Sequence, residues 1–87
     1  MYRFKIFVIL KKGVLDPQGQ AVKKSLHALG YQEVQEVKVG KYMEVDLEAE
    51  SVDVARERVK HMCDKLLANP VIEEYRIEQA EFEPVEG

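Results

Sequence analysis

One apolar run near the N-terminus, YRFKIFVIL from Tyr2 to Leu10, limits the possible folds most strongly. Its alternation is typical of a β-strand, with one face made of Phe4, Ile6 and Val8. The opposite face carries Lys5, Phe7 and Ile9, so it is largely apolar as well. Because both faces of this segment are apolar, we expect both to be covered, and the order of elements derived below places the segment at the centre of a sheet.

The next stretch, GVLDPQGQAVKKSLHALGY, carries the signals of a well-formed helix. Asp16 is a good N-cap, Pro17 suits the first helical position, and Gly30 predicts a left-handed C-cap. The apolar residues recur at helical spacing and predict a single buried stripe, made of Val22, Leu26 and Leu29.

The second half of the chain repeats this pattern with two further strands before the helix. We expect a strand over 34–39, a hairpin turn at Gly40-Lys41, and a strand YMEVDLE whose inward residues are Met43, Val45 and Leu47. Ser51 or Asp53 caps the second helix, whose predicted stripe is Ala55, Val59, Met62 and Leu66. Asn69 and Pro70 end that helix, and a last strand follows over 71–78.

The predicted order is therefore βαββαβ. With right-handed crossovers it gives an α+β ferredoxin-like two-layer sandwich, a four-stranded antiparallel sheet with both helices on one face. We expect a single domain over residues 1–78, and an acidic C-terminal tail over 79–87.

The face of the first strand that the helices leave open predicts self-association. Phe7 and Ile9 lie there with Lys5, close to an acidic row on the neighbouring strand that allows cross-strand charge pairs. That row consists of Glu44, Asp46 and Glu48. Since a central strand seldom leaves apolar side chains in water, we expect a homo-oligomer that covers Lys5, Phe7 and Ile9.

Composition excludes several classes of partner. A net charge of −3 over 87 residues is unlike that of a general nucleic-acid binder, which needs positive charge to neutralise phosphates. No apolar run approaches the roughly 20 residues of a membrane helix. A single cysteine, Cys63, precludes an internal disulfide and indicates the cytoplasm.

Candidate catalytic and ligand-binding patterns are weak throughout. The loop from Gly13 to Gly19 lacks the motifs of a phosphate loop, and Asp16 would repel an anion, so the pattern favours helix capping. Cys63 and His61 are two residues apart on one helix and point away from each other, which favours a buried thiol over a nucleophile. We therefore expect no catalytic, cofactor-binding or metal site on this chain.

Other functions of the predicted fold can be compared by motif. The open sheet face is too acidic, and too poor in aromatic residues, for RNA recognition. The residues of an acylphosphatase-like site and the C-x-x-C of a metal chaperone are missing. A small-molecule-sensing, ACT-like regulatory domain has no sharp motif, and it stays open as an alternative.

Four blocks together carry a resemblance to a known family: LDPQGQAV, LHALGY, VGKYMEVDLE and MCDKLLANPVIEEY. In this combination and spacing, the chain from about Tyr2 to Ile77 resembles the PurS subunits of phosphoribosylformylglycinamidine synthase. The resemblance implies a small non-catalytic subunit of an ATP- and glutamine-dependent carbon–nitrogen ligase in purine biosynthesis. It also implies two protein partners, a glutaminase and a large synthetase that holds ATP and Mg²⁺, and a homo-oligomer, either a dimer or a tetramer.

In such a complex the small subunit would orient its partners and help ammonia pass during conversion of formylglycinamide ribonucleotide to the amidine. We expect its docking surfaces at two loops, Leu15 to Gln18 with Asp16 and Pro17, and Gly40 to Tyr42 with Lys41. The alternative is that both loops merely satisfy local capping and turn chemistry.

Overall fold

Three strands and two helices follow in the order β-α-β-α-β in the computed structural model, which describes residues 1–80. The elements are β1 (Tyr2–Leu10), α1 (Pro17–Ala28), β2 (Lys41–Leu47), α2 (Val52–Met62), a π-helical turn η1 (Cys63–Leu67) and β3 (Glu73–Gln79). The chain is thus α+β, and β1 coincides with the apolar run from Tyr2 to Leu10.

The sheet is antiparallel with the order β2-β1-β3, so β1 lies in the middle as predicted. Lys5 lies directly opposite Glu44 of β2 and opposite Glu78 of β3. The position of Glu44 agrees with the predicted cross-strand charge pattern, whereas that of Glu78 was not predicted.

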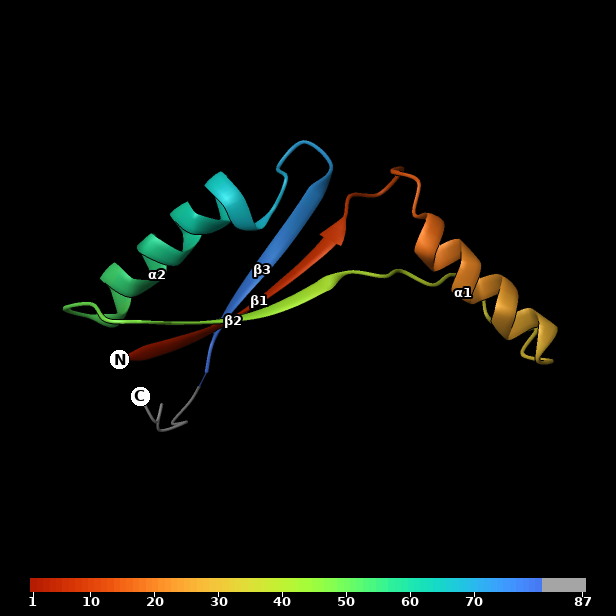
Figure 1. The fold of residues 1–87 in the computed structure, drawn as a ribbon, viewed down its shortest axis with the longest axis horizontal. Coiled ribbons are helices and arrows are strands. Elements are labelled where there is room, and N and C mark those ends of the chain that lie inside the picture. The colour runs from red at the N-terminus through yellow and green to blue at the C-terminus, as the bar shows by residue number, and fades with distance from the viewer. Residues whose placement is uncertain (81–87) are drawn as a thin grey trace.

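The core lies between the sheet and α2, which crosses one face of it (Figure 1). From β1, the predicted inward residues Phe4, Ile6 and Val8 are fully buried, and Ala55 and Val59 of α2 pack against them. Burial of a large aliphatic or aromatic side chain contributes about 1.5–3 kcal/mol, so β1 and α2 carry much of the stability.

In contrast, α1 lies beyond one end of the sheet (Figure 1). The prediction that both helices cover one face of the sheet is wrong, because α2 alone packs on that face. The predicted α1 stripe is not a buried one either: Leu26 is half-buried, but Val22 is 42% exposed and Leu29 is 73% exposed. We refer to residues 14–39, which comprise α1 and the extended segment that returns from it, as the arm.

The predicted strand over 34–39 is not seen, since the described residues form three strands and this segment is not one of them. Its backbone instead bonds to α1 and to the N-cap of α1. His27 Nε2 donates to the Val34 carbonyl at 2.8 Å, and the Val39 amide donates to Asp16 at 3.0 Å. Gly40-Lys41 is accordingly no hairpin turn, and β2 pairs with β1. The four-stranded ferredoxin-like arrangement is therefore not seen in residues 1–80.

The ends of α1 follow the sequence signals closely. Asp16 is the N-cap and Pro17 opens the helix. Gly30 has a φ of 103°, its amide donates to the His27 carbonyl, and the Tyr31 amide donates to the Leu26 carbonyl. These two bonds form a Schellman motif, which only a residue that tolerates the left-handed region can close without strain.

The C-terminal end of α2 departs from the predicted stripe because of η1. There the Ala68 amide donates to the Cys63 carbonyl at 3.0 Å, which adds one residue to that turn. The buried face consequently shifts: Cys63 is fully buried, Leu67 packs against the core, and Leu66 is 83% exposed. The prediction that Leu66 is a core residue is wrong, whereas the buried thiol is confirmed.

The boundary predicted at residue 78 lies one residue before the end of β3 at Gln79. The rest of the predicted acidic tail, residues 81–87, lies outside the described residues. None of the helices within residues 1–80 has the length and apolar character needed to cross a membrane.

Candidate functional site

The two loops predicted to dock partners come together at one carboxylate. Asp16 Oδ1 accepts a hydrogen bond from the Gly19 amide at 2.9 Å, and Oδ2 accepts one from the Val39 amide at 3.0 Å. The first bond caps α1, and the second ties the start of α1 to the residue that precedes Gly40. Segments that are far apart in sequence thereby form one surface.

The same bonds determine the charge of Asp16. The hydrogen bond from the Val39 amide, followed by that from Gly19, lowers the pKa of Asp16 below its usual value. The carboxylate is therefore ionised at neutral pH, and it already occupies a helix-start amide that an incoming phosphate would use. Helix capping rather than phosphate binding is what this loop is built for.

A groove of about 260 Å³ opens between the two loops and the end of the sheet. Five predicted docking residues line it: Asp16, Pro17, Gln18, Gly40 and Lys41. Leu15 lines a neighbouring cavity of about 330 Å³ and is 74% exposed. Asp16 lines both cavities, so Leu15 lies beside the groove.

Glu73 at the start of β3 is a member of this groove that sequence reasoning missed. Its Oε2 lies 3.5 Å from Lys41 Nζ, and its Oε1 accepts a hydrogen bond from the Asn69 amide at 2.6 Å. Glu73 thereby links Lys41 to the turn before β3. Glu73 and Glu74 are neighbours on the last predicted strand, and their spacing contains no signal for the contact between Glu73 and Lys41.

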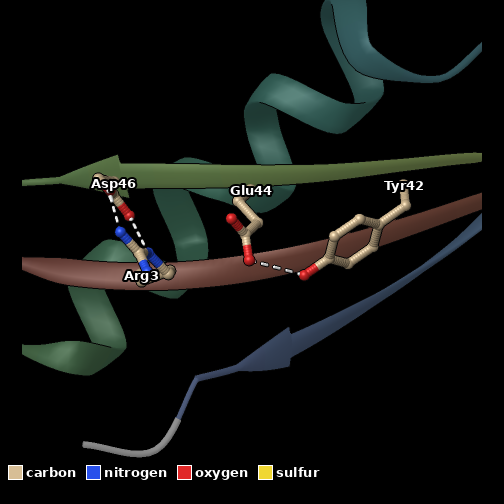
Figure 2. A network of polar contacts seen from close by, with 4 residues as sticks. All are labelled: Arg3, Tyr42, Glu44 and Asp46. Atoms are coloured by element: carbon tan, nitrogen blue, oxygen red, sulfur yellow. Dashed lines mark hydrogen bonds and ion pairs between the residues drawn. The ribbon is translucent and has the colours of Figure 1, made fainter. Parts of the chain in front are cut away.

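Tyr42, the last predicted docking residue, lies apart from the groove on the open face of the sheet. Its hydroxyl donates to Glu44 at 2.8 Å, and Arg3 of β1 holds Asp46 further along the same face (Figure 2). The ring of Tyr42 lies 5.0 Å from that of Phe7, centre to centre. Tyr42 therefore belongs with the predicted self-association face rather than with the groove.

That open face is less apolar than the sequence suggested. Phe7 is half-buried between the Tyr42 ring and the guanidinium of Arg76, which lies 4.5 Å from the centre of the Phe7 ring. Ile9 is half-buried as well, with its Cγ2 close to Gly40. The three candidates Lys5, Phe7 and Ile9 share this face, but neighbouring side chains already cover part of it.

The described residues assemble no catalytic centre. Burial raises the pKa of the Cys63 thiol, and the charge of Asp64 raises it further, so the reactive thiolate is disfavoured. His61 is exposed, whereas His27 is bonded within the arm. No group of three or more His, Cys, Asp or Glu suited to a metal ion occurs among residues 1–80.

Comparison with known proteins gives this arrangement a family. A family model described as "PurS: Phosphoribosylformylglycinamidine (FGAM) synthase" matches residues 3–81. Subunit PurS of that synthase from Bacillus subtilis is 54% identical over 81 residues, which cover 93% of this chain and 95% of the relative. The chain belongs to the PurS family.

Solved PurS structures agree with this assignment. Methanocaldococcus jannaschii PurS, described as one of the subunits of formylglycinamide ribonucleotide amidotransferase in the purine biosynthetic pathway, is 41% identical with a TM-score of 0.83. It covers 95% of this chain, which in turn covers all of it. In the PurLQS structure from Thermotoga maritima, a 34% identical chain has a TM-score of 0.84, with coverage of 91% and 96%.

As a PurS family member, the chain is a non-catalytic subunit of phosphoribosylformylglycinamidine synthase in purine biosynthesis. This confirms the function expected from the four sequence blocks, and it replaces the alternative of a stand-alone metabolite-sensing domain. The groove at Asp16 is the candidate surface for contact with other chains of that complex.

Proposed function

We propose that this chain joins the glutaminase and the ATP-dependent synthetase of the complex, and helps ammonia pass between them. The observation that carries the proposal is the groove, in which one carboxylate, Asp16, holds both candidate docking loops. A relative from Thermotoga maritima is found in an assembly named PurLQS, which supports a role in complex formation.

The division of chemistry follows from what each step needs. Release of ammonia from glutamine requires an activated nucleophile, and activation of an amide by ATP requires phosphate and Mg²⁺ ligands. We assign these to the glutaminase and the synthetase, and assign no cofactor to this chain. Its contribution is geometric, because ammonia that escapes to water near neutral pH becomes ammonium, which is not a nucleophile.

Reconstitution tests the proposal. Glutaminase and synthetase are assayed with and without this chain, and glutamine-dependent and ammonia-dependent turnover are measured separately. We expect this chain to be required for glutamine-dependent turnover, while ammonia at high concentration bypasses it. Glutamine-dependent turnover of equal rate in its absence would refute the coupling role.

A groove variant makes the test specific. Gln18 is exposed and lines the groove, so Gln18→Arg places a bulky charge where a partner would dock. We expect loss of glutamine-dependent turnover with ammonia-dependent turnover retained. The matched control is Gln35→Arg, the same change at an exposed position of the arm outside the groove. Equal effects of the two variants would argue against docking at the groove.

We also propose that the chain forms a homo-oligomer, a dimer or a tetramer. Besides the face with Lys5, Phe7 and Ile9, the arm exposes large apolar side chains, notably Leu15, Leu29 and Tyr31. Lys23 and Lys24 lie on α1, which carries no carboxylate, whereas the open sheet face is rich in carboxylates. Apolar surface with complementary charge is typical of an interface between copies.

Such an assembly could also supply the fourth strand. The segment 34–39 runs as an extended trace between α1 and β2 (Figure 1) and contains Val34, Val37 and Val39, so we propose that it pairs as a strand when copies associate and adds a fourth strand to the sheet. Light scattering across micromolar concentrations measures the oligomer, and amide exchange of residues 34–39 reports the pairing. A monomer at every concentration, or exchange that is independent of concentration, would refute the respective proposal.

The cytoplasm is the compartment we propose for this complex. Cys63 is a free, buried thiol, which suits a reducing compartment, and ATP-dependent synthesis needs the nucleotide pool found there. Cell fractionation followed by immunodetection of this chain would test the assignment.

A further inference from the structure

Two short connections join the arm to the sheet, one that leaves β1 and one that enters β2, and we call them the outgoing and the returning crossing. Each crossing contains a glycine. Gly13 follows β1 with a φ of 89°, and a side chain added there would meet no atom within 4 Å. Gly40 precedes β2, and a Cβ there would collide with the Val8 carbonyl and lie 2.9 Å from Ile9 Cγ2. The outgoing crossing is therefore loosely packed, with Gly13 in the left-handed region of backbone conformation, whereas the returning crossing is tightly packed at Gly40.

Packing of α1 on the sheet does not set the direction of the arm, because α1 lies beyond the end of the sheet (Figure 1). What spans the junction is the carboxylate of Asp16. Asp16 lies three residues after Gly13, and its partner Val39 lies directly before Gly40. A single side chain thus holds the outgoing and the returning crossing together.

Gly19 makes this close approach possible. A Cβ at Gly19 would collide with the Val37 carbonyl and would lie 2.6 Å from Asp16 Oδ2. Gly19 is also the one buried residue of α1. The first turn of α1 therefore packs its backbone directly against the segment 37–39, with the Asp16 carboxylate between them.

We propose that Asp16 is a positioning residue, which sets the angle between the arm and the sheet and so holds the two docking loops in one surface. This rests on the proposed docking function. Capping alone does not require an aspartate, because serine caps a helix about as well. The second oxygen is what an aspartate adds, and here that oxygen accepts the bond from Val39.

Asp16→Ser therefore separates the two roles. A serine hydroxyl keeps a cap for the Gly19 amide, while the Oδ2 that accepts from Val39 is lost. Asp16→Asn is the second variant, since it keeps the shape of the side chain with one acceptor oxygen. The matched control is Ser51→Ala, which removes the cap of α2, where Ser51 Oγ accepts from the Val54 amide.

The geometry of the arm is measured in the full-length chain. Spin labels at Ser25→Cys on α1 and Glu57→Cys on α2, both exposed positions, report the distance from arm to sheet layer. Cys63 is buried and is checked for labelling in the parent chain. Dilution with unlabelled chain removes distances between copies. We expect one narrow distance distribution in the parent chain and in Ser51→Ala, and a broadened or shifted one in Asp16→Ser.

Two further measurements connect geometry to docking. We expect exchange of the Val39 amide to quicken about tenfold in Asp16→Ser, with Asp16→Asn between it and the parent. Affinity for the glutaminase–synthetase pair should fall about tenfold in Asp16→Ser and stay unchanged in Ser51→Ala.

The outcomes separate the two proposals. An unchanged distance distribution in both Asp16 variants overturns the positioning role, even if docking at the groove is real. A displaced arm with unchanged affinity overturns it as well, because docking would then not depend on the angle. Absence of binding by the parent chain refutes the proposed function, while the distance data still decide whether Asp16 sets the angle.

Discussion

Arg3 of β1 and Asp46 of β2 lie directly opposite each other, joined by two hydrogen bonds (Figure 2). Arg3 donates from Nε to Asp46 Oδ1 at 2.7 Å, and from Nη2 to Oδ2 at 3.1 Å. These bonds lower the pKa of Asp46 below its usual value. The ionised form is thus favoured by folding, and this stabilisation is present above the unfolded pKa of about 3.9 and is lost as the pH falls through the folded value.

Replacement of Asp46 by asparagine tests this relationship. We expect the melting temperature of Asp46→Asn to lie below that of the parent at pH 7, by a small amount because the pair is partly exposed to solvent. The difference should shrink as the pH falls below about 4, since the parent then loses the same charge. Glu57→Gln, at an exposed position of α2, is the control. A difference of equal size at pH 7 and pH 3 would contradict the assignment.

The π-helical turn predicts opposite behaviour for two adjacent leucines. Leu67 packs against the core, so Leu67→Ala should lower the free energy of unfolding by about 2 kcal/mol or more. Leu66 is 83% exposed, and Leu66→Ala should change it by less than about 0.5 kcal/mol. Urea denaturation measures both. Because the two variants delete the same atoms, a larger loss in Leu66→Ala would show that the helix continues without the extra residue.

Leu66 and Leu67 also show where prediction of the fold from sequence fails. The ends of α1 were predictable because Asp16, Pro17 and Gly30 act on neighbouring residues. The shift at η1 was not predictable. The added residue in that turn rotates the following side chains about the helix axis, so that Leu67 rather than Leu66 faces the core, and the spacing of apolar residues in the sequence gives no sign of it. Similarly, the valines of the segment 34–39 favour an extended backbone, but they do not identify what that backbone pairs with.

The site shows the same division between local and distant contacts. Both loops became docking candidates once the family resemblance had implied protein partners, and the capping role of Asp16 was predictable from the helix signals around it. The bond from Val39 to Asp16 joins residues 23 positions apart, and no spacing rule predicts it. The contact between Lys41 and Glu73 was unreadable for the same reason. The sequence therefore predicts the members of this surface better than their arrangement.

Tyr75 offers a test of electrostatics near the buried thiol. Its hydroxyl donates to Asp64 at 2.7 Å, and this bond, with smaller effects of burial and charge, raises the pKa of Tyr75 to about 12. Folding thus favours the neutral phenol, and this stabilisation is present below the unfolded pKa of about 10 and is lost as the pH rises through 12.

Ultraviolet titration after a rapid pH jump, before alkaline unfolding, would record this ionisation, and the difference from Tyr75→Phe isolates its signal. We expect Asp64→Asn to bring the pKa of Tyr75 back toward 10, because the amide carries no charge. An unchanged value in Asp64→Asn would show that burial rather than the carboxylate sets the shift.

Gly19 provides a test of the arm that runs against helix propensity. In an exposed helix, replacing glycine with alanine stabilises by about 0.5–1 kcal/mol, yet here the added Cβ would collide with the Val37 carbonyl and lie 2.6 Å from Asp16 Oδ2. We therefore expect Gly19→Ala to melt at a lower temperature than the parent, and its Val39 amide to exchange faster. Ser25→Ala, at an exposed position of the same helix, should melt at the parent's temperature or slightly above it. If Gly19→Ala were the more stable of the two, α1 would not pack against the segment 37–39, and Asp16 could not join the two crossings.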